Sequence, residues 1–181
     1  SKQNFAVLDP SVKEKMRAQV EIARMDCDSL GGIVEIAVTG LPAGLGGPMF
    51  DGVENMIATA VFGIRAVKGI EFGAGFDFAK MRGSEANDQM YYDGDRVRCS
   101  SNNCGGITGG ITNSMPIVFR VALKPTPSIF KEQKTVNLIT GENSTLKIHG
   151  RHDPCIVPRA LPAIEAVTAI AIANLLSEVA D

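Results

Sequence analysis

Three chargeable residues stand side by side in GRHDPC, residues 150–155, between a glycine and a proline. The guanidinium of Arg151 can bind a carboxylate or a phosphate through two parallel hydrogen bonds. A carboxylate such as that of Asp153, placed close to a guanidinium, stays ionised and can accept a proton or orient an N–H group. The stretch therefore predicts an anion site beside an acid/base group. A structural alternative stays open, in which Asp153 caps the following turn and Arg151 is solvated.

A second polar set, KPTPSI at residues 124–129, follows an apolar run directly. Pro125 and Pro127 fix the backbone. Lys124 supplies a positive charge, while Thr126 and Ser128 supply hydroxyl groups. Such a set can hold a phosphate monoester. The other interpretation is a strand end with a proline-stiffened exit.

The glycine run GGITGGIT, residues 105–112, can present backbone N–H groups to a ring or a phosphate. It lacks the Lys-Ser/Thr ending of a phosphate-binding loop and the spacing of a dinucleotide-binding motif. Taken alone, it is better interpreted as a strand in which glycine permits close packing.

Two histidines and a cysteine raise the question of a metal site. His149, His152 and Cys155 have spacings that occur in zinc sites. Cys99 and Cys104 stand in no standard ligand spacing relative to them. No metal is therefore expected.

The bulk composition limits the class of protein. The 181 residues, 45% of them hydrophobic, can bury one substantial core, so we expect a single domain. A net charge of −2 with scattered Lys and Arg argues against nucleic-acid binding and against a membrane-surface helix. No apolar run of transmembrane length and no signal-peptide layout are evident. Four cysteines are too few for a disulfide scaffold, so a cytoplasmic setting is expected.

Apolar periodicity predicts the elements that must position these residues. Predicted helices start at Asp9-Pro10, at Asp51 as an N-cap, and at Ala163, the last running to Val179. Predicted strands cover residues 31–40, 66–76, 117–123 and 145–150, and residues 82–104 form a predicted polar loop. Strands and helices alternate only loosely, which favours an α+β layer arrangement.

Six stretches, in this order, carry a resemblance to a known family. They are SLGGIVEIAVTGLPAGLGGPMFD (29–51), IRAVKGIEFGAGF (64–76), RGSEANDQ (82–89), NNCGGITGGITN (102–113), ALKPTPSI (122–129) and GRHDPCIVPRALPAIEA (150–166). The series as a whole is highly specific and resembles the C-terminal half of chorismate synthase. We therefore interpret residues 1–181 as a single partial domain, with the N-terminal half absent.

The resemblance implies a lyase of aromatic amino acid biosynthesis. The family converts 5-enolpyruvylshikimate 3-phosphate to chorismate and phosphate by a 1,4-anti elimination that requires reduced FMN without net redox change. It implies an α+β sandwich of antiparallel sheet packed on helices, and a homotetramer. Because the substrate-clamping arginines and two histidines belong to the absent half, this chain alone is expected to be inactive.

The resemblance also assigns residues by position. Those that match FMN-contacting sites are Arg65, Ala66, Gly109, Lys124, Pro125, Thr126, Pro127, Ser128 and Arg151. Asp153 matches an aspartate that acts beside flavin N5, with Arg151 facing the charge of flavin or substrate and His152 as a filler between them. Arg65 departs from the pattern, because some members have Asn or Pro before Ala-Val-Lys-Gly.

Two other classes stay open. One is a different FMN- or phosphate-binding protein that uses similar loops, against which the series of motifs argues. The other is a non-catalytic folding or assembly module, which the absent half makes a possible description of this chain.

Overall fold

The computed structural model describes residues 5–150 and 152–178. Its contacts divide the chain into two compact units. The first comprises Ser1–Gly32 and Lys124–Leu161, and the second comprises Ile33–Leu123 and Pro162–Asp181. Antiparallel sheets and helices together make the α+β class that the sequence predicts.

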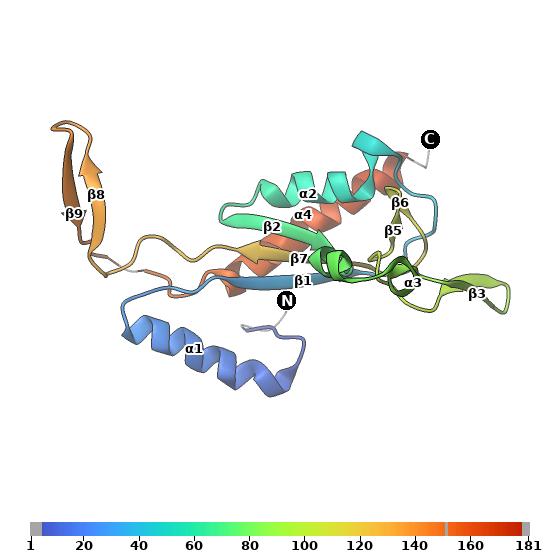
Figure 1. Cartoon of the computed structure of the whole chain (residues 1–181), viewed down its shortest axis with the longest axis horizontal. Coiled ribbons are helices and arrows are strands. Elements are labelled where there is room, and N and C mark those ends of the chain that lie inside the picture. The colour runs from blue at the N-terminus through green and yellow to red at the C-terminus, as the bar shows by residue number, and fades with distance from the viewer. Residues whose placement is uncertain (1–4, 151, 179–181) are drawn as a thin grey trace. The chain divides into compact units, whose positions relative to one another are not determined.

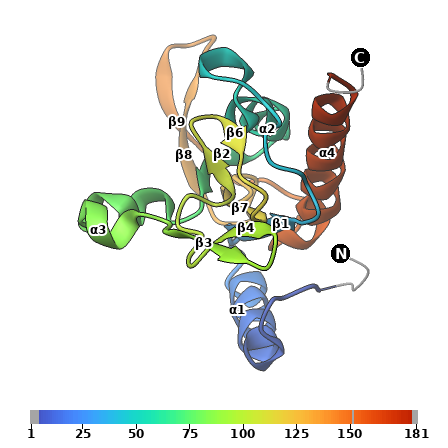
Figure 2. The ribbon, with the colours of Figure 1, turned by 90° about the vertical axis from the view of Figure 1, so that its right-hand side faces the viewer.

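The second unit is built on a three-stranded sheet with the order β1-β7-β2. Its strands are β1 (Gly32–Val38), β7 (Ile117–Leu123) and β2 (Val67–Phe72), and β2 pairs with β7 antiparallel. Helix α2 (Val53–Phe62) and the part of α4 (Val157–Glu178) in this unit lie on the same side of the sheet (Figures 1 and 2). The strand predicted at 117–123 is thus confirmed with the same bounds, and those predicted at 31–40 and 66–76 are confirmed with shorter bounds.

The core of this unit follows from the two-residue period of β7. Ile117, Phe119 and Val121 are all 0% exposed. Arg120 lies on the opposite face and forms an ion pair with Glu71, Nε to Oε1, at 3.0 Å. Because successive side chains of a strand point to opposite faces, the helix-covered face is apolar and the other carries the charges.

Helix α2 buries a stripe of three residues spaced four apart. Val53, Ile57 and Val61 are each 0% exposed. The predicted N-cap is wrong: the cap position is Gly52, and Asp51 ends the short 3-10 helix η2 (Met49–Asp51). In place of a side-chain cap, the N–H of Val53 donates to the carbonyl oxygen of Gly110 at 2.9 Å, which satisfies one of the N–H groups at the helix start.

Residues 82–104 form elements rather than the predicted loop. They contain α3 (Gly83–Ala86) and a hairpin of β3 (Met90–Asp93) and β4 (Arg96–Cys99). The hairpin is exposed on both faces except at Cys99, so it shows no apolar alternation. The sequence feature that could have predicted this hairpin is the Gly94-Asp95 pair, because such a two-residue turn favours glycine. Gly94 there has φ +62°.

The glycine run 105–112 is a tight hairpin. Its strands are β5 (Ile107–Thr108) and β6 (Ile111–Thr112). Gly110 has φ +84°, and a Cβ there would lie 2.4 Å from the carbonyl oxygen of Gly47. The predicted role of glycine, to permit close packing, is confirmed. After β2 the chain turns into the 3-10 helix η3 (Gly75–Lys80).

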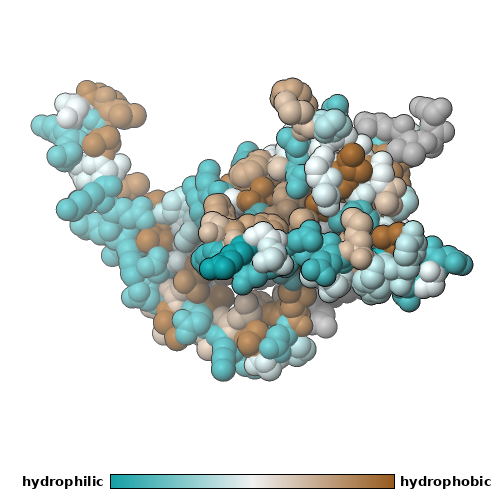
Figure 3. All heavy atoms as spheres, turned by 45° about the vertical axis from the view of Figure 1, so that its right-hand side comes forward, coloured by the Kyte–Doolittle hydropathy of each residue, from teal (hydrophilic) through white to brown (hydrophobic). Residues whose placement is uncertain are grey.

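The first unit contains α1 (Lys13–Met25), preceded by the 3-10 helix η1 (Pro10–Val12). The predicted start is confirmed, since Asp9 Oδ1 accepts from the Ser11 N–H at 2.8 Å. The predicted strand at 145–150 is displaced: β9 is Glu142–Leu146 and pairs with β8 (Gln133–Asn137), which was not predicted. Figure 3 shows apolar surface at the tip of this hairpin, where Leu138 is 91% and Ile139 96% exposed.

Helix α4 begins at Val157, six residues before its predicted start. Pro158 is acceptable in the first turn, because the N–H groups there make no intrahelical hydrogen bond. Pro162 lies inside the helix. Over Val157–Ser177 the helix is long and apolar enough to cross a membrane, with a mean hydropathy of 1.7. Core helices of soluble proteins can share these properties; in this helix Ile164, Ala171 and Leu175 are buried, and 28% of the apolar window is buried in all.

Candidate functional site

Three segments of the first unit meet at what we call the junction: residues 28–30, 126–131 and 152–155. The Ser29 hydroxyl donates to the carbonyl oxygen of Thr126 at 2.6 Å. The Leu30 N–H donates to the carbonyl oxygen of Pro154 at 2.8 Å. Residues 29–30 therefore join the KPTPSI stretch to the GRHDPC turn, so the two polar stretches singled out in the sequence converge.

Both carboxylate oxygens of Asp153 are held. Oδ1 accepts from the Cys155 N–H at 3.3 Å, so Asp153 caps the turn as the structural alternative predicts. Oδ2 forms an ion pair with Nη2 of Arg159 at 2.6 Å. Sequence reasoning missed Arg159. Its position in the first turn of the helix that follows GRHDPC could have indicated a partner for Asp153. The carboxylate keeps an oriented, partly exposed position, 29% accessible, in which it can act on a ligand.

The KPTPSI stretch divides into exposed and enclosed groups. Lys124, Pro125 and Pro127 are exposed, while Thr126 and Ser128 are half-buried. The Oγ1 atom of Thr126 is inaccessible to solvent and has no hydrogen-bond partner in the described part of the chain. A buried polar group without a partner costs about 1–3 kcal/mol.

His152, in the GRHDPC turn, also has a buried polar atom without a partner. Its ring meets the ring of Phe130 edge-on, with centroids 4.6 Å apart and an interplanar angle of 86°. Its Nε2 atom is buried and, among residues 5–150 and 152–178, has no hydrogen-bond partner. Two buried polar atoms without a partner are uncommon in one small region of a native fold.

A charge cluster fixes the edge of the junction. Nζ of Lys131 pairs with Asp28 Oδ2 at 2.9 Å and with Asp26. Hydrogen bonds to Asp26 and then Asp28 raise the pKa of Lys131. The hydrogen bond from Lys131, followed by that from the Ser29 N–H, lowers the pKa of Asp28. The cluster ties the segment after α1 to the segment that leads into β8.

The other predicted cofactor residues lie in the second unit. Arg65 is exposed, and Ala66, at φ +72°, precedes β2 in a left-handed conformation that is strained for alanine. Gly109 stands at the β5–β6 turn with φ +61°, and a Cβ there would meet nothing within 4 Å. Its backbone is therefore open to an approaching ligand. Arg151 lies outside the described residues.

Asp88 holds together two loops of the second unit. Its Oδ1 accepts from the Ser101 hydroxyl at 2.6 Å and the Asn103 N–H at 2.7 Å, and its Oδ2 accepts from the Cys104 N–H at 2.8 Å. Burial raises the pKa of Asp88, but these hydrogen bonds outweigh it and the net shift is downward. The carboxylate thus connects the RGSEANDQ loop to the chain entering the glycine hairpin.

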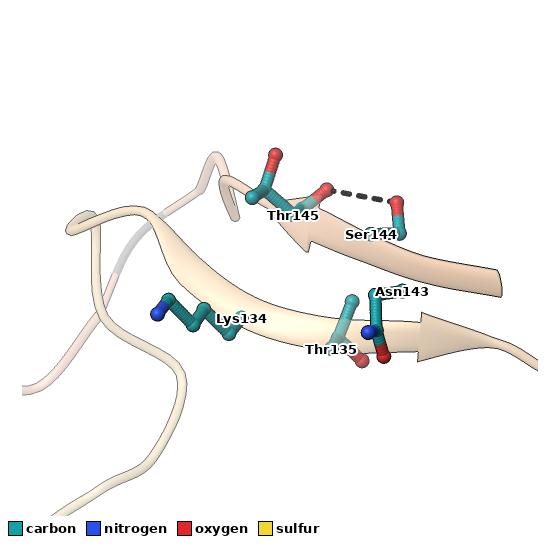
Figure 4. Close-up of a pocket in the computed structure, with 5 residues that line it drawn as sticks. All are labelled: Lys134, Thr135, Asn143, Ser144 and Thr145. Carbon is teal, nitrogen blue, oxygen red and sulfur yellow. Dashed lines mark hydrogen bonds between the residues drawn. The ribbon is translucent and has the colours of Figure 1, made fainter.

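A separate pocket of 680 Å³ lies on the β8–β9 hairpin and contains none of the predicted site residues (Figure 4). Its lining residues are Lys134, Thr135, Asn143, Ser144 and Thr145. All five are exposed, and the hollow offers no enclosed polar atom. Within the described residues no group of three His, Cys, Asp or Glu can hold a metal ion, and the four cysteines are free.

An antiparallel sheet covered by helices defines an α+β protein, and the lysine and hydroxyl loop joined to the aspartate turn is its candidate ligand site. The family model for chorismate synthase matches residues 1–176. The chain belongs to the chorismate synthase family.

Individual relatives agree with this assignment. The chain is 52% identical over 167 residues to chorismate synthase of Dehalococcoides mccartyi and 53% identical over 166 residues to that of Methanosarcina mazei. Each alignment covers 92% of this chain and 46% of the relative. A crystal structure of chorismate synthase superimposes with a TM-score of 0.75 at 33% identity, covering 93% of this chain and 44% of that one. The chain thus spans about half the length of the relatives it matches.

Proposed function

We propose that this chain supplies the flavin-binding part of a carbon–oxygen lyase. The reaction converts 5-enolpyruvylshikimate 3-phosphate to chorismate and phosphate, in aromatic amino acid biosynthesis. Family membership supports the assignment, and the junction supports the place where the cofactor binds.

The cofactor of this proposal is reduced FMN, which when bound supplies transient electron density as phosphate leaves in the 1,4-anti elimination. Lys124 provides a positive charge for an anionic group. Thr126 and Ser128 provide hydroxyls on a backbone stiffened by Pro125 and Pro127. The remaining residues assigned to the cofactor are Arg65, Ala66, Gly109 and Arg151.

Asp153 is the acid/base group of the proposal. The Cys155 N–H and Arg159 each hold one of its oxygens, so the carboxylate stays oriented. An acid/base group acts efficiently when its position is fixed before the proton moves. Asp153 therefore holds or moves a proton at the ligand, and Arg159 is its positioning residue.

One observation carries the proposal. The KPTPSI stretch and the aspartate turn come together at Ser29 and Leu30, and Thr126 Oγ1 is buried there with no partner in the described chain. A buried polar atom without a partner is uncommon in a native fold and calls for an explanation. A cofactor with hydrogen-bonding edges explains it.

The setting of the enzyme completes the proposal. We place it in the cytoplasm as a homotetramer, with neither nucleic acid nor a membrane as partner. The exposed Leu138 and Ile139 at the hairpin tip offer an apolar surface that supports subunit association.

A non-catalytic assembly module is the second candidate. The observation in its favour is that the chain spans about 46% of its relatives. A module of this kind would keep the fold without binding FMN, which separates the two candidates.

The test joins this chain to the N-terminal half of the Methanosarcina mazei relative. Incubated without oxygen with reduced FMN and 5-enolpyruvylshikimate 3-phosphate, the joined protein should release phosphate and chorismate in equal amounts. Omission of FMN should stop both. A joined protein that melts cooperatively but forms no chorismate, while the intact relative does, would refute the lyase assignment.

A further inference from the structure

Ser29 holds the KPTPSI stretch near its centre. The residue is 9% exposed, and its hydroxyl donates to the carbonyl oxygen of Thr126 at 2.6 Å. Thr126 stands between Pro125 and Pro127, whose rings fix their own φ angles and also restrict the residues before them. Because the backbone on both sides of this carbonyl is stiff, one hydrogen bond there orients the neighbouring residues as well.

The next residue along the chain holds the GRHDPC turn. The N–H of Leu30 donates to the carbonyl oxygen of Pro154, the residue after Asp153, at 2.8 Å. Consecutive Cα atoms are about 3.8 Å apart, so two neighbouring residues fix the spacing between the KPTPSI stretch and the turn with the carboxylate. The contact at Leu30 uses the backbone alone, whereas the contact at Ser29 depends on a side chain. Ser29 is the part of this link that a substitution can remove.

The backbone of Ser29 is itself oriented by its neighbours. The N–H of Ser29 donates to Asp28 Oδ1 at 2.8 Å, and Asp28 Oδ2 accepts from Nζ of Lys131 at 2.9 Å. Lys131 lies two residues after the KPTPSI stretch, so the ion pair returns to the segment that the Ser29 hydroxyl holds. A partly exposed ion pair adds little stability by itself, but here it limits the positions that Ser29 can take.

We propose that Ser29 is a positioning residue of the proposed enzyme, whose hydroxyl fixes the KPTPSI stretch relative to the turn that carries Asp153. The inference rests on the proposed function, because it takes FMN as the ligand of the stretch and Asp153 as the acid/base group. Ser29 acts through Thr126 and not by contact with the ligand. Since catalysis depends on groups that are held in place before the reaction, loss of this link should lower both FMN affinity and turnover.

A hydrogen bond that serves the fold alone would have a different consequence, and the chain offers a matched control for it. Nε2 of Gln133 donates to the carbonyl oxygen of Pro127 at 2.9 Å. Gln133→Ala thus removes a side-chain donor from a carbonyl of the same stretch, as Ser29→Ala does. The contact of Gln133 does not involve residues 29–30, which hold the GRHDPC turn.

The experiment uses the protein joined to the N-terminal half of the Methanosarcina mazei relative. The variants are Ser29→Ala, Ser29→Thr, Gln133→Ala, Lys124→Ala and the double variant of Ser29→Ala with Lys124→Ala. Each is measured by thermal melting, by fluorescence titration with oxidised FMN, and by single-turnover chorismate formation at saturating reduced FMN. If Ser29→Ala does not melt cooperatively, Ser29→Cys takes its place, because a thiol is a weaker hydrogen-bond donor than a hydroxyl.

Ser29→Ala should bind FMN about tenfold more weakly and form chorismate about tenfold more slowly. Ser29→Thr keeps the hydroxyl and should retain most of both properties. Gln133→Ala should change neither, although it also loses a hydrogen bond. The weakening of FMN binding by Lys124→Ala should be at least about threefold smaller when Ser29→Ala is already present, because residues that act together have non-additive effects. A Ser29 that serves the fold alone would lower only the melting temperature.

Four results would overturn the inference, and they are distinguishable. Unchanged affinity and rate in Ser29→Ala leave the proposed function intact and make Ser29 a structural residue. Equal losses in Gln133→Ala and Ser29→Ala show that any loosened contact of the stretch has this effect, without a link to the turn. Additive effects of Ser29→Ala and Lys124→Ala on affinity show that the hydroxyl does not act through the stretch. Absence of FMN binding to the joined protein overturns both this inference and the assignment of the stretch to FMN.

Discussion

The residues of the junction fall into two groups. In one group the polar side-chain atoms have hydrogen-bond or ion-pair partners, and in the other they have none. Asp153 is held at both oxygens, by the Cys155 N–H and by Arg159. Thr126 Oγ1 and His152 Nε2 have no partner in the described residues. If Asp153 is the acid/base group of the proposed function, its fixed carboxylate needs little reorganisation before it acts.

Lys124 is expected to bind FMN rather than to stabilise the fold. Its side chain is exposed beside the enclosed hydroxyl of Thr126, so Lys124→Ala should leave the melting temperature unchanged. Loss of one charge-assisted contact should weaken FMN binding about ten- to hundredfold. The FMN affinity is measured by fluorescence titration, on the protein joined to the N-terminal half of the relative. Lys134→Ala, an exposed lysine of the hairpin pocket, is the control, and equal affinities in the two variants would contradict the assignment.

Asp153→Asn should separate proton transfer from structure. Asparagine keeps an acceptor for the Cys155 N–H but cannot take a proton, so turnover of the joined protein should fall by about 10²–10⁴-fold. The lost ion pair is largely exposed on the Arg159 side, and such pairs contribute less than about 1 kcal/mol. Single-turnover chorismate formation measures the loss.

Arg159→Ala is the companion variant, because it leaves the carboxylate and removes its positioning partner. Its turnover should fall by less than that of Asp153→Asn, with FMN affinity unchanged. An unaltered rate in Asp153→Asn would leave Asp153 as a turn cap and nothing more.

Residue types predicted the two polar stretches of the junction but not how each group is held. The cap formed by Asp153 was foreseeable, since aspartate before a turn commonly accepts a backbone N–H. The Arg159 contact was not, because it depends on α4 starting at Val157. The unpaired atoms of Thr126 and His152 are properties of burial, which sequence spacing does not reveal.

At the scale of elements, prediction succeeded where one face is buried. β7 alternates buried and less buried residues along its whole length, and it was predicted within its observed bounds. The β3–β4 and β8–β9 hairpins are exposed almost throughout, so no apolar alternation marked them. Prolines concealed the start of α4, since Pro162 inside a helix is uncommon.

The Asp88 carboxylate connects loops of the second unit, and its removal should weaken that connection in a pH-dependent way. Its pKa is lower in the folded chain than the unfolded value of about 3.9. A depressed pKa contributes stability that is present above the unfolded value and lost as the pH falls through the folded value. Urea unfolding should therefore show a free energy that declines as the pH drops below about 4.

Asp88→Asn should remove this part of the pH dependence. It should also lower the unfolding free energy at pH 7 by about 1.5–3 kcal/mol, because a neutral amide with one acceptor oxygen replaces a charged carboxylate with two. Asp95→Asn, at the exposed β3–β4 turn, is the control. Parallel pH profiles for Asp88→Asn and the unmodified chain would show that the carboxylate contributes nothing as a charge.

At the scale of the whole molecule, the predicted cofactor residues fall in both compact units. Lys124–Ser128 and Asp153 belong to the first, and Arg65, Ala66 and Gly109 to the second. The residues that the resemblance assigns to the cofactor are therefore not confined to one unit. Sequence patterns described the local stretches, whereas the division into units depends on contacts between residues distant along the chain.

The chain by itself should fold yet form no chorismate. Folding is expected because the second unit has an apolar core in which Ile57, Phe119 and Ile164 are fully buried. Turnover is not expected, because the chain spans about 46% of its relatives and stabilisation of the leaving phosphate requires charges that the resemblance places in the other half. FMN should bind weakly, since an incomplete cleft buries less of the ligand and excludes less water. Circular dichroism melting establishes folding, and phosphate release from 5-enolpyruvylshikimate 3-phosphate with reduced FMN under anaerobic conditions measures turnover. The joined protein is the positive control, and turnover by the chain alone at a comparable rate would show that the catalytic groups are all present in these 181 residues.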